Sequence, residues 1–305
     1  MRALCLIVVA IESLRCVLAL PDPFGDKPLR IGDVGEPVKI AKELLCRSSF
    51  VMRDPECGGG IVDDIFDSKT SAWVNSFQKG NDLPNSGGVI DEDTALAILS
   101  LHGEDGYEDD GAAANATGGY RYKILIPVHR NRSIQTNGTF LDASNKVIFT
   151  FPVRAKGHEA DNNGHMIPST WPDYNGTGDG LNQFSHSGMT PTGLSEIDLN
   201  SPEDNATLYG PYPVTRFVRG LAGNAKFLIP SQRNGILIHT GEWPDFDGTD
   251  MPNSAGCVHT LPHFVEQIWT QSVSEGAVVR PNSNGKLPYP WKGQGLASVF
   301  TVDRQ

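Results

Sequence analysis

Apolar residues recur at helical spacing in the first third of the chain. Between residues 38 and 45 they lie three and four positions apart, which predicts a helix. Asp67 and Ser68 are good N-cap residues before a second apolar-periodic segment, and a third such segment begins near Asp91 or Asp93. Glycines separate the three segments. We therefore expect a small helical module over residues 30–102.

From Tyr120 onwards the pattern changes to short alternating or apolar runs between Gly, Asn, Pro and Asp loops, which is typical of strands. Proline suits the first turn of a helix, so one helix is expected after Pro262. The segment 103–119 is rich in acidic and small residues, and we interpret it as a flexible linker. A β-rich domain over 120–305 follows from this pattern. The runs that we interpret as strands are 120–128, 146–153, 225–229, 235–239 and 297–302.

The first nineteen residues resemble a cleaved secretory signal. Met1-Arg2 is positive, residues 3–11 are apolar, and Val17-Leu18-Ala19 has the spacing of a cleavage site. Two charges interrupt the run, so a buried N-terminal helix is the alternative. Asn-x-Ser/Thr sequons also favour export to a glycosylating pathway, with the protein secreted or extracellular, or periplasmic and wall-associated in a bacterium. These sequons begin at Asn115, Asn131, Asn137, Asn175 and Asn205.

Charge and hydropathy narrow the classes of partner. The 305 residues include 25 basic and 36 acidic side chains, a formal net charge of −11. A nucleic-acid partner needs a basic footprint, so nucleic acid is not expected. Beyond the first twenty residues no run is long and apolar enough to span a bilayer, so stable membrane insertion is not expected.

The cysteines divide into three groups. Cys5 and Cys16 leave with the signal segment. Cys46 and Cys57 are close in sequence, and we expect them to form a disulfide in an oxidising compartment, which suits a module too small to hold a large core. Cys257 is then unpaired, either as an inert core residue or as a reactive thiol.

The chemistry-bearing residues gather in 235–259. His239 ends an apolar strand, and Cys257 follows a turn-prone Ser254-Ala-Gly256 run just before the Pro262 helix. A thiol beside an imidazole and near a helix N-terminus becomes a usable nucleophile. The backbone N–H groups of Gly256 and Cys257 are candidates for an oxyanion hole. These groups together suit acyl transfer.

Two family resemblances are carried by these and other residues. Gly35-Glu-Pro-Val38, Phe77-Gln-Lys-Gly80, Gly88-Val-Ile-Asp91 and Thr94 are similar to the three-helix peptidoglycan-binding domain, which implies that residues 30–102 bind peptidoglycan. A plain three-helix spacer is the alternative. The insertion that carries Cys57 departs from the family pattern.

The second resemblance is to the L,D-transpeptidase family, also called the YkuD domain, over about residues 120–303. It rests on His239, on Ser254-Ala-Gly-Cys257 eighteen residues later, and on a Thr-Pro-x-Gly turn within Ser187–Gly193. The resemblance implies Cys257 as nucleophile and His239 as acid and base, without a cofactor. It implies that Ser254 and Gly256 support the oxyanion or the substrate. We add Thr240 and His259 to this supporting group.

Ala255 and His259 depart from the residues most members carry, which makes hydrolysis or weak activity more plausible. We therefore expect an α+β protein of two domains, a three-helix module and a catalytic domain of β-sandwich type with a few helices. Its expected function is acyl transfer on peptidoglycan stem peptides, by L,D-transpeptidation or L,D-carboxypeptidation through a Cys257 thioester.

Three alternatives remain open. The alternative to an acyltransferase is a non-catalytic or weakly active protein that binds or recognises peptidoglycan. A zinc site at Cys257, His259 and His263 lacks the usual ligand motifs. Trp171, Tyr174 and Trp243 line a groove or serve only in packing, and His158 and His165 are expected to be solvated.

Overall fold

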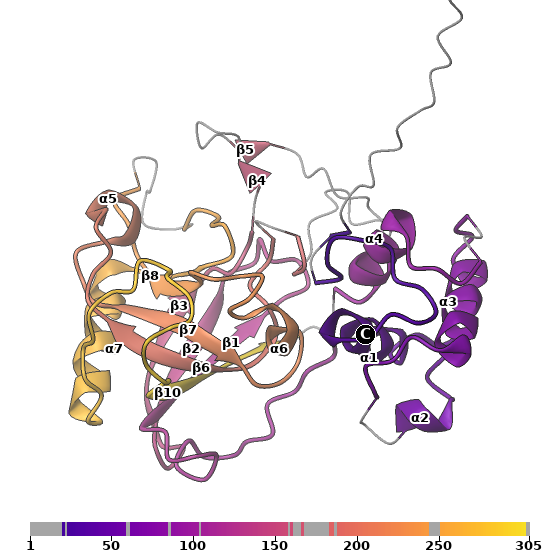
Figure 1. Ribbon diagram of the computed structural model, residues 1–305. Helices are drawn as coiled ribbons and strands as arrows, with labels where there is room; N and C mark the ends of the chain where they lie inside the picture. The colour runs from indigo at the N-terminus through magenta and orange to yellow at the C-terminus, as the bar shows by residue number, and fades with distance from the viewer. Residues whose placement is uncertain are drawn as a thin grey trace, which may run out of the picture. The chain divides into compact units, whose positions relative to one another are not determined.

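The structure is a computed structural model that describes residues 20–21, 23–58, 62–84, 87–103, 105–157, 159–160, 166–167, 183–185, 188–243 and 251–302. By its internal contacts the chain divides into two compact units, Met1–Ala95 and Leu96–Gln305. The fold is mixed α+β (Figure 1).

Helices form the first unit. They are α1 (Glu36–Leu45), α2 (Pro55–Gly58), α3 (Ser68–Gly80) and α4 (Glu92–Leu101), of which α4 continues into the second unit. Three of them lie where the apolar spacing predicts helices. Asp67 caps α3, because its side chain accepts a hydrogen bond from Thr70 N at 2.7 Å.

A disulfide and a buried lysine hold the first unit together. Cys46, directly after α1, bonds to Cys57 in α2, which confirms the predicted pairing. Lys42 of α1 is 1% exposed and pairs with Glu56 at 2.7 Å and with Asp63 at 2.6 Å. The cross-link and the ion pairs both attach the 54–63 segment to α1.

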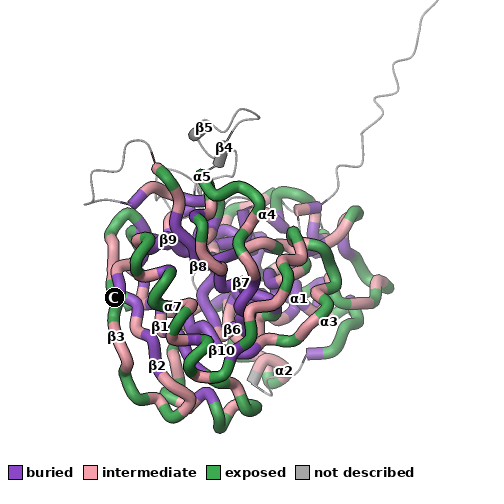
Figure 2. The backbone as a smooth tube through the Cα atoms, turned by 90° about the vertical axis from the view of Figure 1, so that its left-hand side faces the viewer, coloured by how far each residue is buried: buried purple, intermediate pink, exposed green. Residues whose placement is uncertain are grey.

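The second unit is built on one eight-stranded sheet with the order β3-β2-β1-β10-β6-β7-β8-β9. Buried residues are concentrated along its central strands (Figure 2). A separate two-stranded sheet pairs β4 (Glu159–Ala160) with β5 (Met166–Ile167). The strands of the large sheet are β1 (Tyr122–Val128), β2 (Thr136–Asp142), β3 (Val147–Val153), β6 (Gly193–Asn200), β7 (Val214–Gly220), β8 (Leu237–His239), β9 (Val258–His259) and β10 (Gly295–Thr301).

The edges of this sheet meet, so the expected β-sandwich is wrong for the described strands. Arg154, directly after β3, donates its N–H to His259 O at 3.0 Å, and His259 N–H donates to Arg154 O at 2.8 Å. Because His259 belongs to the opposite edge strand, these two bonds join the edges and the sheet becomes a near-barrel.

Three helices complete the second unit: α5 (Ala206–Tyr209), α6 (Ala225–Leu228) and α7 (Pro262–Ser274). The proline-started helix is thus confirmed, and α7 lies against β7 and β8. The strand expected over 225–229 is wrong, since α6 occupies it. A short apolar run fits a buried helical turn as well as a buried strand, and Phe227 and Leu228 are buried either way.

The segment expected as a linker makes specific contacts within the second unit. Asp109 pairs with the buried Lys123 of β1 at 2.8 Å, and Asp105 accepts a hydrogen bond from Thr192 Oγ1 at 2.8 Å. None of the described helices has the length and apolar character needed to cross a bilayer.

Candidate active site

Cys257, His239 and His259 lie on or directly beside the neighbouring strands β8 and β9. Strands β8 and β9 run parallel, with His239 paired to His259. Cys257 lies directly before β9, and its Sγ is 3.6 Å from Gly235 O and is hydrogen-bonded by the Leu237 backbone at the start of β8. The two imidazole rings meet edge to face, with centroids 4.7 Å apart.

His239 is held as a neutral base. It is 3% exposed, and its Nδ1 lies 2.7 Å from the carbonyl oxygen of Thr240. A carbonyl oxygen only accepts, so Nδ1 carries the proton and the lone pair lies on Nε2. Burial lowers the pKa of His239 to about 4, while the bond to Thr240 acts in the opposite direction. At neutral pH the ring can accept a proton.

His259 repeats this arrangement one strand away. Its Nδ1 lies 2.8 Å from the carbonyl oxygen of Pro252, which again makes Nδ1 the donor. Trp243 lies against its ring at a centroid distance of 4.8 Å, and Tyr209 lies against His239 at 5.1 Å. Trp243, for which the sequence allowed either a groove-lining or a packing role, thus contacts the candidate site.

Cys257 is a free thiol that is protonated at rest. The residue keeps part of its surface exposed, but the protein surrounds the sulfur, and burial raises the pKa of the thiol to about 11. A hydrogen bond from the Leu237 backbone and the charges of Arg233 and Arg216 act in the opposite direction. The thiol donates a hydrogen bond to Gly235 O at 3.6 Å. Attack on a substrate therefore requires a base.

The turn before Cys257 is closed by Ser254. Ser254 Oγ donates to Cys257 O at 2.7 Å and accepts from Gly256 N–H at 3.0 Å. The Gly256 N–H is thus engaged, and within the described residues the Cys257 N–H has no internal partner. Of the two amides expected to bind an oxyanion, that of Cys257 is the one available.

Thr240 acts through its backbone, since its carbonyl oxygen orients His239. Its side chain is 1% exposed, and its Oγ1 has no hydrogen-bond partner among the described residues. The Thr-Pro-x-Gly segment also reaches the site, because Thr190 Oγ1 donates to Gly256 O at 2.9 Å. Thr190 and Gly256 therefore lie together, although they come from distant parts of the chain.

Sequence reasoning missed Arg233. The residue is 4% exposed, and its guanidinium donates to Ala255 O in the turn at 3.1 Å. It lies in a polar Ser-Gln-Arg-Asn loop with no motif around it, so no sequence signal distinguishes it from a surface arginine. Its other acceptors are the carbonyl oxygens of Gln183, Ser185, Gly188 and Met189.

Several expected residues lie away from this cluster or outside the described residues. His263 is exposed on α7 and contacts Phe264. In the part of the chain that the structure describes, no group of three or more His, Cys, Asp or Glu side chains is arranged to hold a metal ion. The described sequon asparagines, Asn115, Asn131, Asn137 and Asn205, are exposed. Residues 1–19, His158, His165, Trp171, Tyr174, Asn175 and Ser187 lie outside the described residues.

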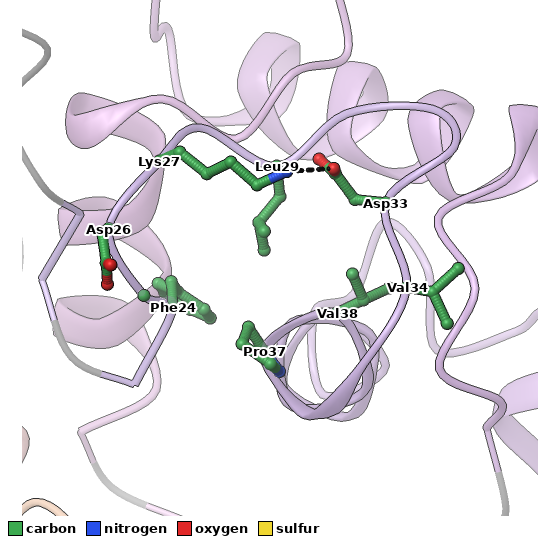
Figure 3. Close-up of a pocket in the computed structure, with 9 residues that line it drawn as sticks. Phe24, Asp26, Lys27, Leu29, Asp33, Val34, Pro37 and Val38 are labelled. Carbon is green, nitrogen blue, oxygen red and sulfur yellow. Dashed lines mark hydrogen bonds and ion pairs between the residues drawn. The ribbon is translucent and has the colours of Figure 1, made fainter.

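The first unit contains a cavity of about 450 Å³ between the 24–34 loop and α1 (Figure 3). Phe24, Leu29 and Val38 give it an apolar lining. The Lys27–Asp33 ion pair, 2.6 Å long, lies along its rim.

Comparison with known proteins leaves the family of this chain open. No protein-family model matches it, and no curated protein matches it. A similar solved structure is that of Bd1075 from Bdellovibrio bacteriovorus, with a TM-score of 0.33 and 14% sequence identity. The match covers 62% of this chain and 50% of that one, so this chain spans about half the length of that protein.

Proposed function

We propose that the protein is a secreted cysteine acyltransferase that acts on peptidoglycan stem peptides, by L,D-transpeptidation or L,D-carboxypeptidation. The observation that carries the proposal is that the sulfur of a free Cys257 lies against the backbone of Gly235 and Leu237, in the segment that ends at a neutral His239. The chemical class follows from this pair, and the substrate follows from the family resemblance. The helical unit at the N-terminus is proposed to bind peptidoglycan.

In the proposed reaction, His239 Nε2 takes the thiol proton and Cys257 Sγ attacks the carbonyl carbon of the amide before a terminal D-alanine. The Cys257 N–H donates to the oxyanion that forms. The C–N bond breaks, His239 returns the proton to the leaving amine, and D-alanine departs, leaving a thioester. Water or the side-chain amine of a second stem then attacks the thioester, gives a proton to Nε2, and releases the thiol.

The test is D-alanine release from disaccharide-tetrapeptide by the reduced protein. We expect Cys257→Ala to abolish release and His239→Asn to lower it by at least about a hundredfold, the usual contribution of a general base. His263→Gln is the matched control, because His263 is exposed and lies outside the cluster. Mass spectrometry after incubation with a carbapenem is expected to map an adduct to Cys257. Release by Cys257→Ala at the wild-type rate contradicts the nucleophile.

A second candidate function is peptidoglycan recognition with little or no turnover. The high pKa of the thiol and the low pKa of His239 favour it, because they make a thiolate–imidazolium pair costly in the free protein. This function predicts that the full chain sediments with insoluble peptidoglycan and releases no D-alanine. Substitution of Cys257 then changes neither result.

A further inference from the structure

Hydrogen bonds hold the two peptide groups that precede Cys257, one at both of its polar atoms and the next at its carbonyl oxygen. The peptide between Ala255 and Gly256 has its carbonyl oxygen bonded to Arg233 Nη2 and its N–H bonded to Ser254 Oγ. A peptide group is planar, so fixing its two polar atoms fixes its orientation. The carbonyl oxygen of the next peptide, Gly256 O, accepts from Thr190 Oγ1. The direction of the Cys257 N–H is fixed by the same planarity.

Arg233 links this turn to the rest of the site. Its Nη1 donates to Gln183 O at 2.9 Å and to Ser185 O at 3.1 Å, and its Nη2 donates to Gly188 O at 3.0 Å and to Ala255 O at 3.1 Å. A planar guanidinium can satisfy such diverging carbonyl groups together, which a lysine ammonium cannot do with the same geometry. Among the described residues, all its hydrogen-bond partners are carbonyl oxygens.

Gly256 makes the approach of Arg233 possible. A Cβ at this position would lie 1.9 Å from Arg233 Nη2, and the residue has φ of +100°, which favours glycine. The small residue of the turn and the buried arginine are therefore complementary.

We propose that Arg233 is a positioning residue, which holds the Ser254–Cys257 turn so that the sulfur and the Cys257 N–H face the substrate together. Its charge has a second effect, because it favours the Cys257 thiolate. The catalytic consequence rests on the proposed function, whereas the effect on the thiol does not. Charged and titratable groups that influence Cys257 are Arg233, Arg216, Glu203 and Tyr209, and His239 and His259 lie on the neighbouring strands β8 and β9.

Two readouts separate these effects. The first is the pH midpoint of Cys257 alkylation by iodoacetamide, followed by mass spectrometry. The second is kcat and KM for D-alanine release. Arg233→Gln removes both the charge and the planar guanidinium. We expect the pH midpoint of alkylation to rise by about one pH unit, equivalent to about tenfold less thiolate below the midpoint. Arg233→Lys keeps a charge, so its midpoint stays near that of the wild type while kcat falls at least about tenfold and KM changes little.

Arg219→Gln is the matched control. Arg219 lies on β7, its side chain is 60% exposed, and it pairs with Glu196 rather than with the turn. We expect both readouts to stay at their wild-type values in this variant. Gly256→Ala is the second variant, for use if Arg233→Gln does not fold. Its added Cβ displaces the Arg233 guanidinium from the turn, so the pH midpoint of Cys257 alkylation is expected to rise in this variant too.

An unchanged midpoint in Arg233→Gln, or in Gly256→Ala where the first variant does not fold, overturns the proposal. Wild-type kcat in Arg233→Lys also overturns it. Absence of D-alanine release by the wild-type protein contradicts the proposed function alone, since the alkylation midpoint still decides the role of Arg233.

Discussion

Acidification from about pH 7.5 to about pH 5 is expected to destabilise the protein through His239. Burial lowers the pKa of this residue from 6.5 to about 4. As the pH falls, the unfolded chain therefore binds a proton near pH 6.5, whereas the folded chain resists it until about pH 4. The stability contributed by neutral His239 is complete above pH 6.5 and is lost progressively between pH 6.5 and 4.

The magnitude follows from the difference between the two pKa values. Each pKa unit corresponds to about 1.4 kcal/mol, so complete loss amounts to about 3 kcal/mol. At about pH 5 the folded ring is still mostly neutral and the unfolded ring is mostly charged, which gives a loss of about 2 kcal/mol. A loss of this size is a large fraction of the usual free energy of unfolding.

Urea unfolding of the wild type and His239→Asn at both pH values measures this contribution. The variant lacks the titrating ring, so its free energy of unfolding should fall by about 2 kcal/mol less than that of the wild type. Comparing the two changes cancels the other titrating groups, and His263→Gln, exposed in the same unit, should behave like the wild type. Equal losses in wild type and His239→Asn would refute the buried, neutral His239.

Three further predictions concern other parts of the molecule. Replacing Cys46 and Cys57 together by alanine should lower the stability of the first unit by about 3 kcal/mol, the loop-closure value for a separation of 11 residues. Hydrogen exchange should show the loss in α1 and α3 and leave β6 and β7 unchanged. Lys42→Met should lower the free energy of unfolding by about 1 kcal/mol, because it keeps the buried stem but removes the ion pairs to Glu56 and Asp63, whereas Lys42→Ala also loses the stem and should lose at least about 2 kcal/mol in urea unfolding. At about pH 8, iodoacetamide should alkylate Cys257 about a hundredfold more slowly than a free cysteine, given its raised pKa. Alkylation at the rate of free cysteine would contradict its burial.

Local pattern was sufficient for several elements. The helices α1, α3, α4 and α7 lie where apolar periodicity and capping residues predict them, because these signals arise within a few residues of the chain. The Cys46–Cys57 disulfide also follows from short separation. The α+β class rests on the same kind of information, since each periodicity reports one element at a time.

Local pattern failed where tertiary partners satisfy buried polar groups. Asp198 and Asn200 of β6 and Arg216 of β7 are almost fully buried, and they bond to partners elsewhere in the second unit. Buried charges obscure the alternation of apolar and polar positions, so β6 and β7 gave no strand signal. The strand expected at 225–229 failed for a related reason, since only its packing decides between strand and helical turn.

The candidate site divides in the same way. Sequence alone nominated Cys257, His239 and Ser254 as candidates, because the residue types needed for acyl transfer lie within a short segment. Only the tertiary structure decided which ring nitrogen of His239 is hydrogen-bonded, which turn amide is available, and that Arg233 donates to the turn. The reason is physical: register, burial and carbonyl acceptors come from segments far apart in the chain, and no local pattern contains them.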